Sequence, residues 1–249
     1  MFYSEQVLQA AQALSRCKKI MVLTGAGMST ESGIPDFRSP GSGIWNKMDP
    51  EDFTIDRFKS KPERFYTLGA DFLYDILNAE PHDGHRALGE MEKCGMIQGV
   101  ITQNIDGLHQ KGGSQKVIEV HGTLQTASCI SCKKQMSIED VMERVRFGDV
   151  PPLCSQCGEP IKPDVILFGE AMPPAYQEAL EESQSADGML VLGSSLVVSP
   201  ANMLPQFAKR LVIINRGFTP YHDRADAVIE DKISVVLPQI KDALMQRQV

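Results

Sequence analysis

Four of the six cysteines have the spacing of a metal site. Cys129 and Cys132 form one C-x2-C pair, and Cys154 and Cys157 form a second pair after residues 133–153. This spacing is typical of a zinc ribbon, in which two turns surround one tetrahedral ion. Two redox dithiols or an iron–sulfur centre are the alternatives. Because four thiolates complete a tetrahedral shell, we expect zinc here to hold structure and to take no part in chemistry.

A glycine-rich loop follows the first strongly apolar run. Ile20–Leu23 leads into Gly25 and Gly27, the context in which backbone N–H groups and a helix N-terminus hold a pyrophosphate. Thr30 stands where a dinucleotide fingerprint has its third glycine, and the expected acidic ribose ligand is missing. The loop therefore predicts nucleotide binding and argues against hydride transfer. A tight turn that needs glycine for positive φ is the alternative.

Amide and carboxylate side chains follow another apolar run. Gln103, Asn104 and Asp106 come directly after Gly99–Thr102, at the strand end where α/β sheets bind their ligands. This placement predicts a functional cluster. Simple turn formation by the asparagine and aspartate is the alternative for each residue.

One histidine ends an apolar run. His121 follows Val117–Val120, and an imidazole at a strand end is a candidate general base because its pKa lies near neutrality. A hydrogen-bonded structural histidine is the alternative. The other histidines have no such position, although His109 shares the polar cluster described above.

Small polar residues also follow two later runs. Ser194 and Ser195 come after Met189–Leu192, and Asn215 comes after Leu211–Ile214. Hydroxyl and amide groups at these positions suit ribose and adenine recognition, with capping of the strand ends as the alternative. Before them in the chain, residues 33–38 are too rich in Pro and Gly for a helix, and we expect a flexible flap there.

Helical patterns alternate with the apolar runs. Residues 4–16, His85–Cys94 and Pro174–Gln184 have helical periodicity. Seven runs are strand candidates: Ile20–Leu23, Gly99–Thr102, Val117–Val120, Val165–Phe168, Met189–Leu192, Leu211–Ile214 and Ala227–Ile229. The alternation is typical of βαβ units, so we predict an α/β fold with a parallel sheet.

Two segments interrupt this alternation. Residues 41–80 look helical and rich in aromatic residues, and residues 126–163 contain the four paired cysteines. We interpret both as insertions that form a small domain. The main domain would then be discontinuous, made of residues 1–40, 81–125 and 164–249.

Composition limits the partners. The chain has 25 Lys and Arg residues against 32 Asp and Glu residues, a formal net charge of −7 at pH 7. This balance gives no reason to bind nucleic acid or anionic membranes and would suit a basic peptide. No signal peptide or membrane-spanning run is seen, so we expect a cytoplasmic protein. Disulfides are then not expected, and Cys17 and Cys94 are interpreted as buried thiols.

The motifs together resemble those of sirtuins, which are NAD-dependent protein lysine deacylases, most of all the bacterial cytosolic branch. From about residue 15 to residue 235 the chain contains GAGMSTESGIPDFR, TQNIDGLH, VIEVHG, the paired CxxC motifs, PDVILFGE, GSSLVVSP and IINRG. Their order and approximate spacing are those of the family. The resemblance implies a Rossmann-type large domain, a small domain built from the zinc ribbon and the helical insertion, and a cleft between them.

The resemblance also implies site residues. It implies NAD contacts at Gly25, Ala26, Gly27, Thr30, Asp36, Phe37, Arg38, Gln103, Ile105, Asp106, His121, Gly193, Ser194, Ser195, Asn215, Arg216 and Ile233. It implies contacts with the substrate peptide at Ile166, Phe168, Gly169, Glu170 and Val198, partly by strand addition. His121 would be the general base, and Asn104 would arrange water and ribose during cleavage.

The implied reaction transfers the acyl group of an acyl-lysine to ADP-ribose and releases nicotinamide and O-acetyl-ADP-ribose. Mono-ADP-ribosyl transfer or NAD hydrolysis at the same site is the alternative, and a zinc-stabilised binding module without turnover is another. Desuccinylases of the family have a Tyr-x-x-Arg pair, whereas here Tyr66 is followed by Thr67, Leu68 and Gly69. We therefore expect neutral acyl groups, acetyl first, with longer chains if the acyl tunnel is deep.

Overall fold

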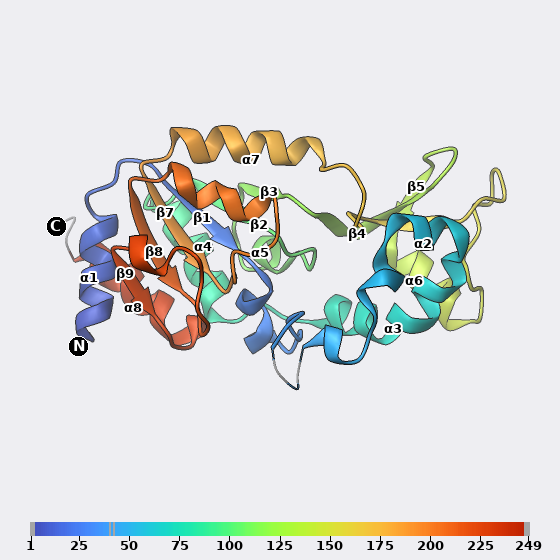
Figure 1. Ribbon diagram of the computed structural model, residues 1–249, viewed down its shortest axis with the longest axis horizontal. Helices are drawn as coiled ribbons and strands as arrows, with labels where there is room; N and C mark the ends of the chain where they lie inside the picture. The colour runs from blue at the N-terminus through green and yellow to red at the C-terminus, as the bar shows by residue number, and fades with distance from the viewer. Residues whose placement is uncertain (1–2, 40, 42, 247–249) are drawn as a thin grey trace.

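A parallel sheet forms the centre of the larger body of the molecule (Figure 1). The computed structural model describes residues 3–39, 41 and 43–246. Within them, six strands are arranged in the order β3-β2-β1-β7-β8-β9. Their bounds are Ile20–Thr24 for β1, Gly99–Thr102 for β2, Val117–Glu119 for β3, Gly188–Leu192 for β7, Arg210–Ile214 for β8 and Ala227–Ile229 for β9. All neighbouring pairs are parallel, which confirms the predicted α/β class.

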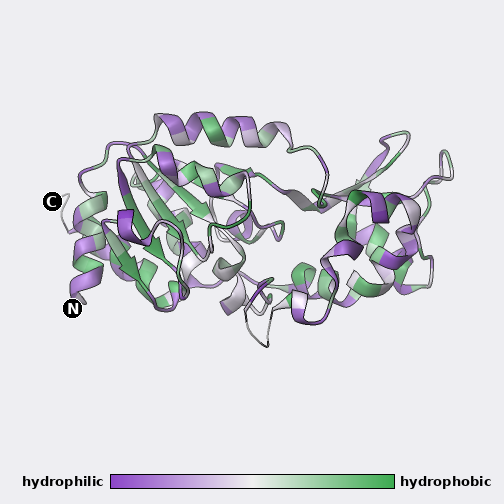
Figure 2. Cartoon of the chain, viewed as in Figure 1, coloured by the Kyte–Doolittle hydropathy of each residue, from purple (hydrophilic) through white to green (hydrophobic). Residues whose placement is uncertain are grey.

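Helices cover both faces of this sheet. On one face lie α1 (Glu5–Leu14), α4 (Asp83–Lys93) and α8 (Ile233–Met245), and on the other lie α7 (Pro174–Ser185) and the 3₁₀ helix η5 (Ala201–Phe207). Because successive strand residues point to opposite faces, Val22 packs with the first group and Met21 and Leu23 pack with the second. Sheets buried on both faces read as continuous apolar runs, and Figure 2 shows these strands as mainly hydrophobic.

A second body contains the two inserted segments. Its helices are α2 (Ile55–Ser60), α3 (Pro62–Asn78) and α6 (Ile138–Arg146), preceded by the short 3₁₀ helices η3 (Ile44–Asn46) and η4 (Pro50–Phe53). Its strands β4 (Gly122–Cys129), β5 (Gln135–Ser137) and β6 (Ile161–Val165) form an antiparallel sheet in the order β5-β4-β6.

The two insertions share one hydrophobic core. Phe58, Phe65 and Leu73 of the helical segment pack with Leu124 and Ile161 of the strands. Two tyrosine hydroxyls tie the segments together: that of Tyr66 donates to the carbonyl of Ile161, and that of Tyr74 donates to the carbonyl of Met142, each at 2.7 Å. Neither segment could bury its apolar face alone.

One predicted strand is wrong. The strand ends at Val165 and belongs to the antiparallel sheet, so the parallel sheet has no strand at 165–168. After Val165 the backbone instead bonds to other segments, because Ile166 N–H donates to the carbonyl of His121 and Phe168 N–H donates to that of Phe53. Strand β4 also crosses the proposed boundary between residues 125 and 126, and residue 40 lies outside the described residues. The division into domains stays a prediction.

The strand order places a crevice at the middle of the sheet. From β1 the chain moves outward through β2 and β3, and from β7 it moves the opposite way through β8 and β9. Doubly wound sheets bind ligands at such a switch point, beyond the carboxyl ends of the two central strands. The glycine loop after β1 and residues 193–195 after β7 therefore face the same crevice.

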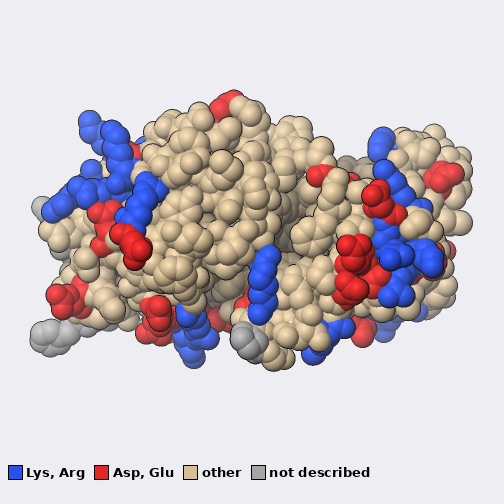
Figure 3. All heavy atoms as spheres, viewed as in Figure 1, with Lys and Arg blue, Asp and Glu red and all other residues tan. Residues whose placement is uncertain are grey.

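The surface carries its charges unevenly. Figure 3 shows Lys, Arg, Asp and Glu gathered toward the two ends of the visible face, with few across the hollowed middle. Among the described residues, no helix combines the length and the apolar composition needed to cross a bilayer.

Three histidines, here called the histidine cluster, pack together near the end of β1, where His109 contacts Thr24. The ring centroids of His82 and His85 lie 4.3 Å apart, and those of His85 and His109 lie 5.0 Å apart. His85 and His109 are fully buried. Burial, aided by the neighbouring histidines, lowers the pKa of His85 to about 2 and that of His109 to about 3. Both imidazoles are therefore neutral near neutral pH.

This cluster predicts a loss of stability in mild acid. Since the folded-state pKa values of His85 and His109 lie below the unfolded value of about 6.5, protons bind preferentially to the unfolded chain as the pH falls below that value. Between about pH 7 and about pH 5.5 we expect the two residues to remove roughly 2 kcal/mol from the free energy of unfolding. Urea unfolding at the two pH values measures it. Replacing His85 by Phe should remove about half of the pH dependence, and an unchanged slope would contradict the assignment.

Candidate active site

A single cleft collects the residues that the sequence singled out. Its volume is about 670 Å³, and it lies between the carboxyl ends of the central strands and the second body. Every candidate residue named for cofactor or peptide binding lines it: Gly25, Ala26, Gly27, Thr30, Asp36, Phe37, Arg38, Gln103, Asn104, Ile105, Asp106, His121, Ile166, Phe168, Gly169, Glu170, Gly193, Ser194, Ser195, Val198, Asn215, Arg216 and Ile233. Their individual contacts with ligands stay predictions.

The glycine loop approaches the end of β7 very closely. A Cβ atom on Gly27 would lie 2.8 Å from the carbonyl oxygen of Gly193, and one on Gly25 would lie 2.9 Å from Cβ of Ser194. Gly193 has φ +58°, and a Cβ there would lie 2.1 Å from the backbone N of Met28. The close packing that a third glycine provides in a dinucleotide fingerprint is thus provided by Gly193, which explains how Thr30 can be tolerated.

The helix expected after this loop is absent from the described residues. Two three-residue 3₁₀ helices, η1 (Ala26–Met28) and η2 (Thr30–Ser32), follow β1 instead. The N–H groups of Gly25, Gly27, Met28 and Ser29 already donate to backbone carbonyls. A pyrophosphate here would therefore meet the N–H groups of Ala26 and Thr30, without the dipole of a long helix. Gly33, in the left-handed region at φ +91°, ends the second turn and starts the flap.

The imidazole of His121 is held in one tautomer. Its Nδ1 lies 3.0 Å from the backbone carbonyl oxygen of Gln103, and a carbonyl only accepts, so the proton is on Nδ1. Nε2 is left with a free lone pair, as a general base requires. Burial lowers the pKa of His121, while this hydrogen bond acts in the opposite direction, so the ring is neutral near neutral pH.

Backbone constraints fix the place of this histidine. The next residue, Gly122, has φ +75°, and a Cβ there would lie 2.1 Å from the carbonyl oxygen of Asp164. On the other side, Ile166 N–H donates to the carbonyl of His121. The base therefore lies where the parallel sheet passes into the antiparallel sheet of the second body.

A buried network orients Asn104. Its Nδ2 donates to the carbonyl oxygen of Gly25 at 3.1 Å and to Oγ of Ser29 at 3.0 Å. Ser29 Oγ in turn donates to Oδ2 of Asp106 at 2.7 Å, and the other oxygen of Asp106 accepts from Leu108 N–H. Because both side-chain hydrogens of Asn104 are used, its carbonyl oxygen is the group left for the cleft. Burial raises the pKa of Asp106 against these hydrogen bonds.

Some candidate side chains serve the local fold in this structure. The carboxylate of Asp36 accepts from the backbone N–H groups of Arg38 and Ser39 and from the hydroxyl of Ser39. The carboxylate of Glu170 accepts from Leu167 N–H at 2.7 Å and pairs with Lys162 at 3.1 Å. These two residues therefore shape the flap and the 166–170 loop, whatever they contact when a ligand is bound.

An apolar wall of the cleft was missed by sequence reasoning. Helix α3 contributes Phe65, Gly69, Phe72, Leu73 and Ile76, which share one helical stripe. Aromatic rings continue the wall to the flap, since Trp45 lies 5.1 Å from Phe37, 5.6 Å from Phe53 and 6.1 Å from Phe168 between ring centroids. The stripe was visible as a periodic pattern, but a core-facing stripe has the same periodicity. Ser29 was also missed.

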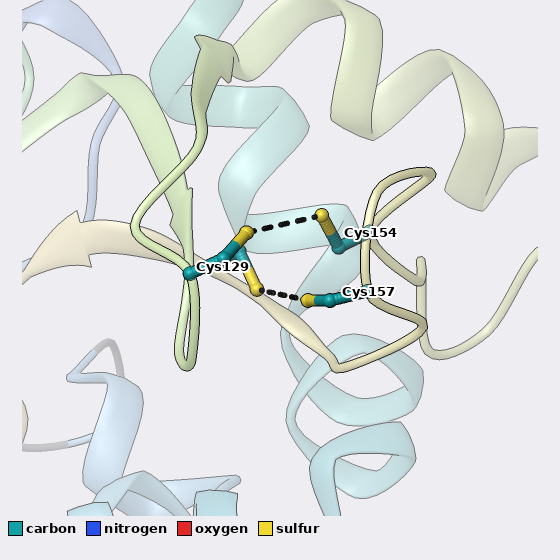
Figure 4. Close-up of side chains that lie close together, drawn as sticks. Cys129, Cys154 and Cys157 are labelled. Atoms are coloured by element: carbon teal, nitrogen blue, oxygen red, sulfur yellow. Dashed lines mark hydrogen bonds between the residues drawn. The ribbon is translucent and has the colours of Figure 1, made fainter.

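The four paired cysteines converge in the second body. Their sulfurs lie within 4.8 Å of one another, and Figure 4 shows those of Cys129, Cys154 and Cys157 pointing toward a common centre. The Sγ–Sγ distances are 3.4 Å for Cys129 and Cys157 and 3.6 Å for Cys132 and Cys154. Four thiolates around a tetrahedral zinc lie about 3.8 Å apart, so the set fits one ion.

Backbone N–H groups favour the thiolate at Cys154, whereas the neighbouring cysteines raise the pKa of Cys157. Backbone N–H groups of Gln156 and Cys157 lower the pKa of Cys154 to about 6, and Gln156 N lies 3.4 Å from its sulfur. The cluster joins the end of β4 to the 154–157 turn and packs on α6. It lies outside the cleft lining, as expected of a structural ion. Cys94, expected to be buried, is exposed at the C-cap of α4.

Metal content should depend on the paired cysteines alone. We expect one zinc per chain, and Cys129→Ser should lose the zinc together with the cooperative unfolding of the second body, because a structural zinc contributes folding free energy. Elemental analysis and thermal unfolding measure both. Cys94→Ser is the matched control and should keep the metal. A full equivalent of zinc on Cys129→Ser would overturn the assignment.

Known proteins match this chain over nearly its whole length. Residues 25–200 match the profile of the Sir2 family. An "NAD-dependent protein deacetylase 2" of Caldanaerobacter subterraneus subsp. tengcongensis is 51% identical over 233 residues, which cover 93% of each chain. A structure described as "Structural Basis for the Mechanism and Regulation of Sir2 Enzymes" superposes with a TM-score of 0.90 at 38% identity, covering 98% of this chain and 100% of that one. A "Sir2-p53 peptide-NAD+" structure gives a TM-score of 0.85 at 39% identity, covering 96% and 97%. This chain belongs to the Sir2 family, also called the sirtuins.

Proposed function

We propose that this protein is an NAD-dependent deacetylase of lysine side chains in proteins. The observation that carries the proposal is the convergence in one cleft of the glycine loop, a histidine with a free Nε2 and an apolar wall. Relatives named NAD-dependent protein deacetylases and Sir2 structures with acetylated or propionylated peptides support it.

The overall reaction is balanced by one water. Acetyl-lysine, NAD and water become lysine, nicotinamide and O-acetyl-ADP-ribose, so NAD supplies the ADP-ribose that receives the acetyl group. The N–H groups of the glycine loop that are not bonded to backbone carbonyls, those of Ala26 and Thr30, would hold this co-substrate together with Ser194, Ser195 and Asn215. Gln103 would lie beside its ribose, since its Nε2 already donates to Ser194 Oγ at 2.9 Å.

His121 and Asn104 would do the chemistry at the ribose. The free Nε2 of His121 would take the proton of a ribose hydroxyl as that hydroxyl attacks the acyl group, a role that contributes about 10²–10⁴-fold. The amide oxygen of Asn104 would orient water and ribose while nicotinamide leaves. Zinc would support the second body, because four cysteines leave it no open position.

The peptide would add as a strand beside the 166–170 loop. Both backbone groups of Phe168 are bonded to η4 and α2, to the carbonyl of Phe53 and the N–H of Ile55. The N–H groups of Ile166 and Glu170 are bonded to the carbonyls of His121 and Leu167. The carbonyls of Ile166 and Glu170 and the backbone groups of Gly169, together with Val198 across the cleft, are then the groups for strand addition.

The domain division and the location belong to the same proposal. Residues 1–40, 81–125 and 164–249 would form the Rossmann-type domain, and residues 41–80 and 126–163 the small domain. The four paired cysteines, which hold zinc in this proposal, suit the cytoplasm, where thiols are kept reduced.

Acetyl groups should be removed much faster than succinyl groups. The Tyr66 hydroxyl is buried against Ile161, Gly69 offers no side chain, and Arg38 and Arg216 are the cations among the described lining residues. Neither arginine is on α3, where the apolar wall would bury the acyl end. An unpaired carboxylate buried there costs several kcal/mol, so we expect at least about a tenfold difference in kcat/KM. Propionyl-lysine, whose acyl group is larger than acetyl but uncharged, is the control for the size of the acyl group. Faster removal of succinyl than of acetyl would be contrary to this assignment.

Nicotinamide release separates the proposed activity from its alternative. Chromatography of NAD incubated with the protein should show nicotinamide only when an acetyl-lysine peptide is present. Equal release of nicotinamide with an unmodified peptide, or without any peptide, would favour mono-ADP-ribosyl transfer or NAD hydrolysis at the same site.

A further inference from the structure

A chain of buried hydrogen bonds leads from the histidine cluster to Asn104. Nε2 of His109 lies 2.9 Å from Oγ1 of Thr24, which lies 2.8 Å from Oγ1 of Thr102. Oγ1 of Thr102 accepts from the backbone N–H of Asn104 at 3.0 Å. The two threonines end β1 and β2 and stand opposite each other in the strand register.

We propose that His109 is a positioning residue for Asn104 and acts through the hydroxyls of Thr24 and Thr102. The inference rests on the proposed function, in which Asn104 contacts the reacting ribose. His109 itself does not line the cleft.

The position of Asn104 depends on this chain because its side chain is anchored elsewhere. Nδ2 is bonded to Gly25 and Ser29, both of the glycine loop, while the backbone N–H is bonded to Thr102 on the sheet. The side chain of Asn104 is anchored to the glycine loop and its backbone N–H to the sheet. A shift of that N–H would therefore rotate the side-chain amide of Asn104 relative to the cleft. Small displacements of positioning groups reduce rates strongly, by up to about 100-fold for 1 Å.

Because the hydrogen-bond chain is buried, the orientation of each group in it depends on its neighbours. Thr24, Thr102 and His109 are all within 2% of complete burial. Without competing water, each hydroxyl must satisfy its polar neighbours, so a change at the histidine alters the orientation of the next groups. The low pKa of His109 keeps the ring neutral near neutral pH, so no group of the hydrogen-bond chain changes its charge there.

The opposite end of the histidine cluster holds the glycine loop. His82 Nδ1 accepts from Gly84 N–H at 2.9 Å, so its proton is on Nε2, which donates to the carbonyl oxygen of Met28 at 2.6 Å. His85 lies between the other two rings, and neither of its nitrogens has a hydrogen-bond partner among the described residues. His85 is therefore a matched control: it is equally buried in the same cluster but is not bonded to the hydroxyl chain.

The test compares His109→Leu, His109→Gln, Thr102→Val and His85→Leu, each checked for thermal unfolding and zinc content. His109→Leu and Thr102→Val should lower kcat for nicotinamide release by about 10- to 100-fold, with KM for NAD changed less than about threefold. His109→Gln should recover part of the rate because its amide can bond to Thr24. His85→Leu should destabilise the fold as much as His109→Leu but keep kcat. An equal loss of kcat in both leucine variants would reduce His109 to a core residue and overturn the proposal.

A readout without turnover separates this proposal from the proposed function. The backbone N–H of Asn104 is buried and bonded, so its hydrogen exchange should be slow in the wild type and in His85→Leu and at least about tenfold faster in Thr102→Val and His109→Leu. If the wild type does not deacetylate, the exchange result still tests the hydrogen-bond chain. Unchanged exchange in His109→Leu would refute it even in an active enzyme.

Discussion

Replacing His121 by Ala is expected to lower deacetylation of an acetyl-lysine peptide by about 10³-fold, while NAD affinity stays within a few-fold of the wild type. The variant removes the free Nε2, and the residues expected to bind NAD through the glycine loop and the ends of β7 and β8 are untouched. Initial rates and calorimetric titration with NAD measure the two quantities.

The pH profile gives the same prediction a second readout. Burial lowers the pKa of His121, so the base is lost only below the ordinary value of about 6.5, and the acid limb of kcat should lie below that pH. His222→Ala is the control, because His222 lies outside the cleft lining. A parallel loss of NAD affinity in His121→Ala would mean that the residue mainly shapes the site.

Replacing Gly193 by Ala is expected to disrupt the cofactor site altogether. Its backbone is left-handed, and the added Cβ would lie 2.1 Å from Met28 N and 2.3 Å from the carbonyl carbon of Gly27, both backbone atoms that cannot move aside. We expect NAD affinity to fall by at least about 100-fold, with a loss of several kcal/mol in stability, as for overpacking combined with backbone strain.

A substitution at a second glycine, Gly148, separates the effect of backbone strain from that of steric crowding. Gly148 also has positive φ, at +90°, but a Cβ there would meet nothing within 4 Å. Gly148→Ala should cost only about 1 kcal/mol and leave NAD binding intact. If Gly193→Ala were equally mild, the contact between the glycine loop and β7 would not be essential.

Much of the site could be predicted because parallel sheets place ligands at strand ends. Gln103, Asn104, Ser194 and Asn215 all follow buried runs, and the strand order brings those ends to one crevice. The four zinc ligands could also be predicted, because the spacing of the two CxxC pairs already defines the set.

The remainder depended on tertiary context. The apolar pattern of Val165–Phe168 predicts a buried strand. Which sheet the strand joins, and that it ends at Val165, depend on the pairing of β6 with β4. The missing helix after the glycine loop could not be anticipated, because the close approach of Gly193 comes from a segment far along the chain. The α3 wall and the histidine cluster likewise have patterns that any buried helix or core histidine would share.

The destination of the acetyl group distinguishes acyl transfer to ADP-ribose from simple hydrolysis and from ADP-ribosylation of protein. A peptide carrying deuterated acetyl-lysine is incubated with the protein, with and without NAD, and the products are followed by mass spectrometry. We expect peptide with unmodified lysine only when NAD is present, and labelled O-acetyl-ADP-ribose in equal amount to nicotinamide. Label released as acetate without consumption of NAD, or ADP-ribose attached to protein while the acetyl group stays on lysine, would contradict the proposed acyl transfer.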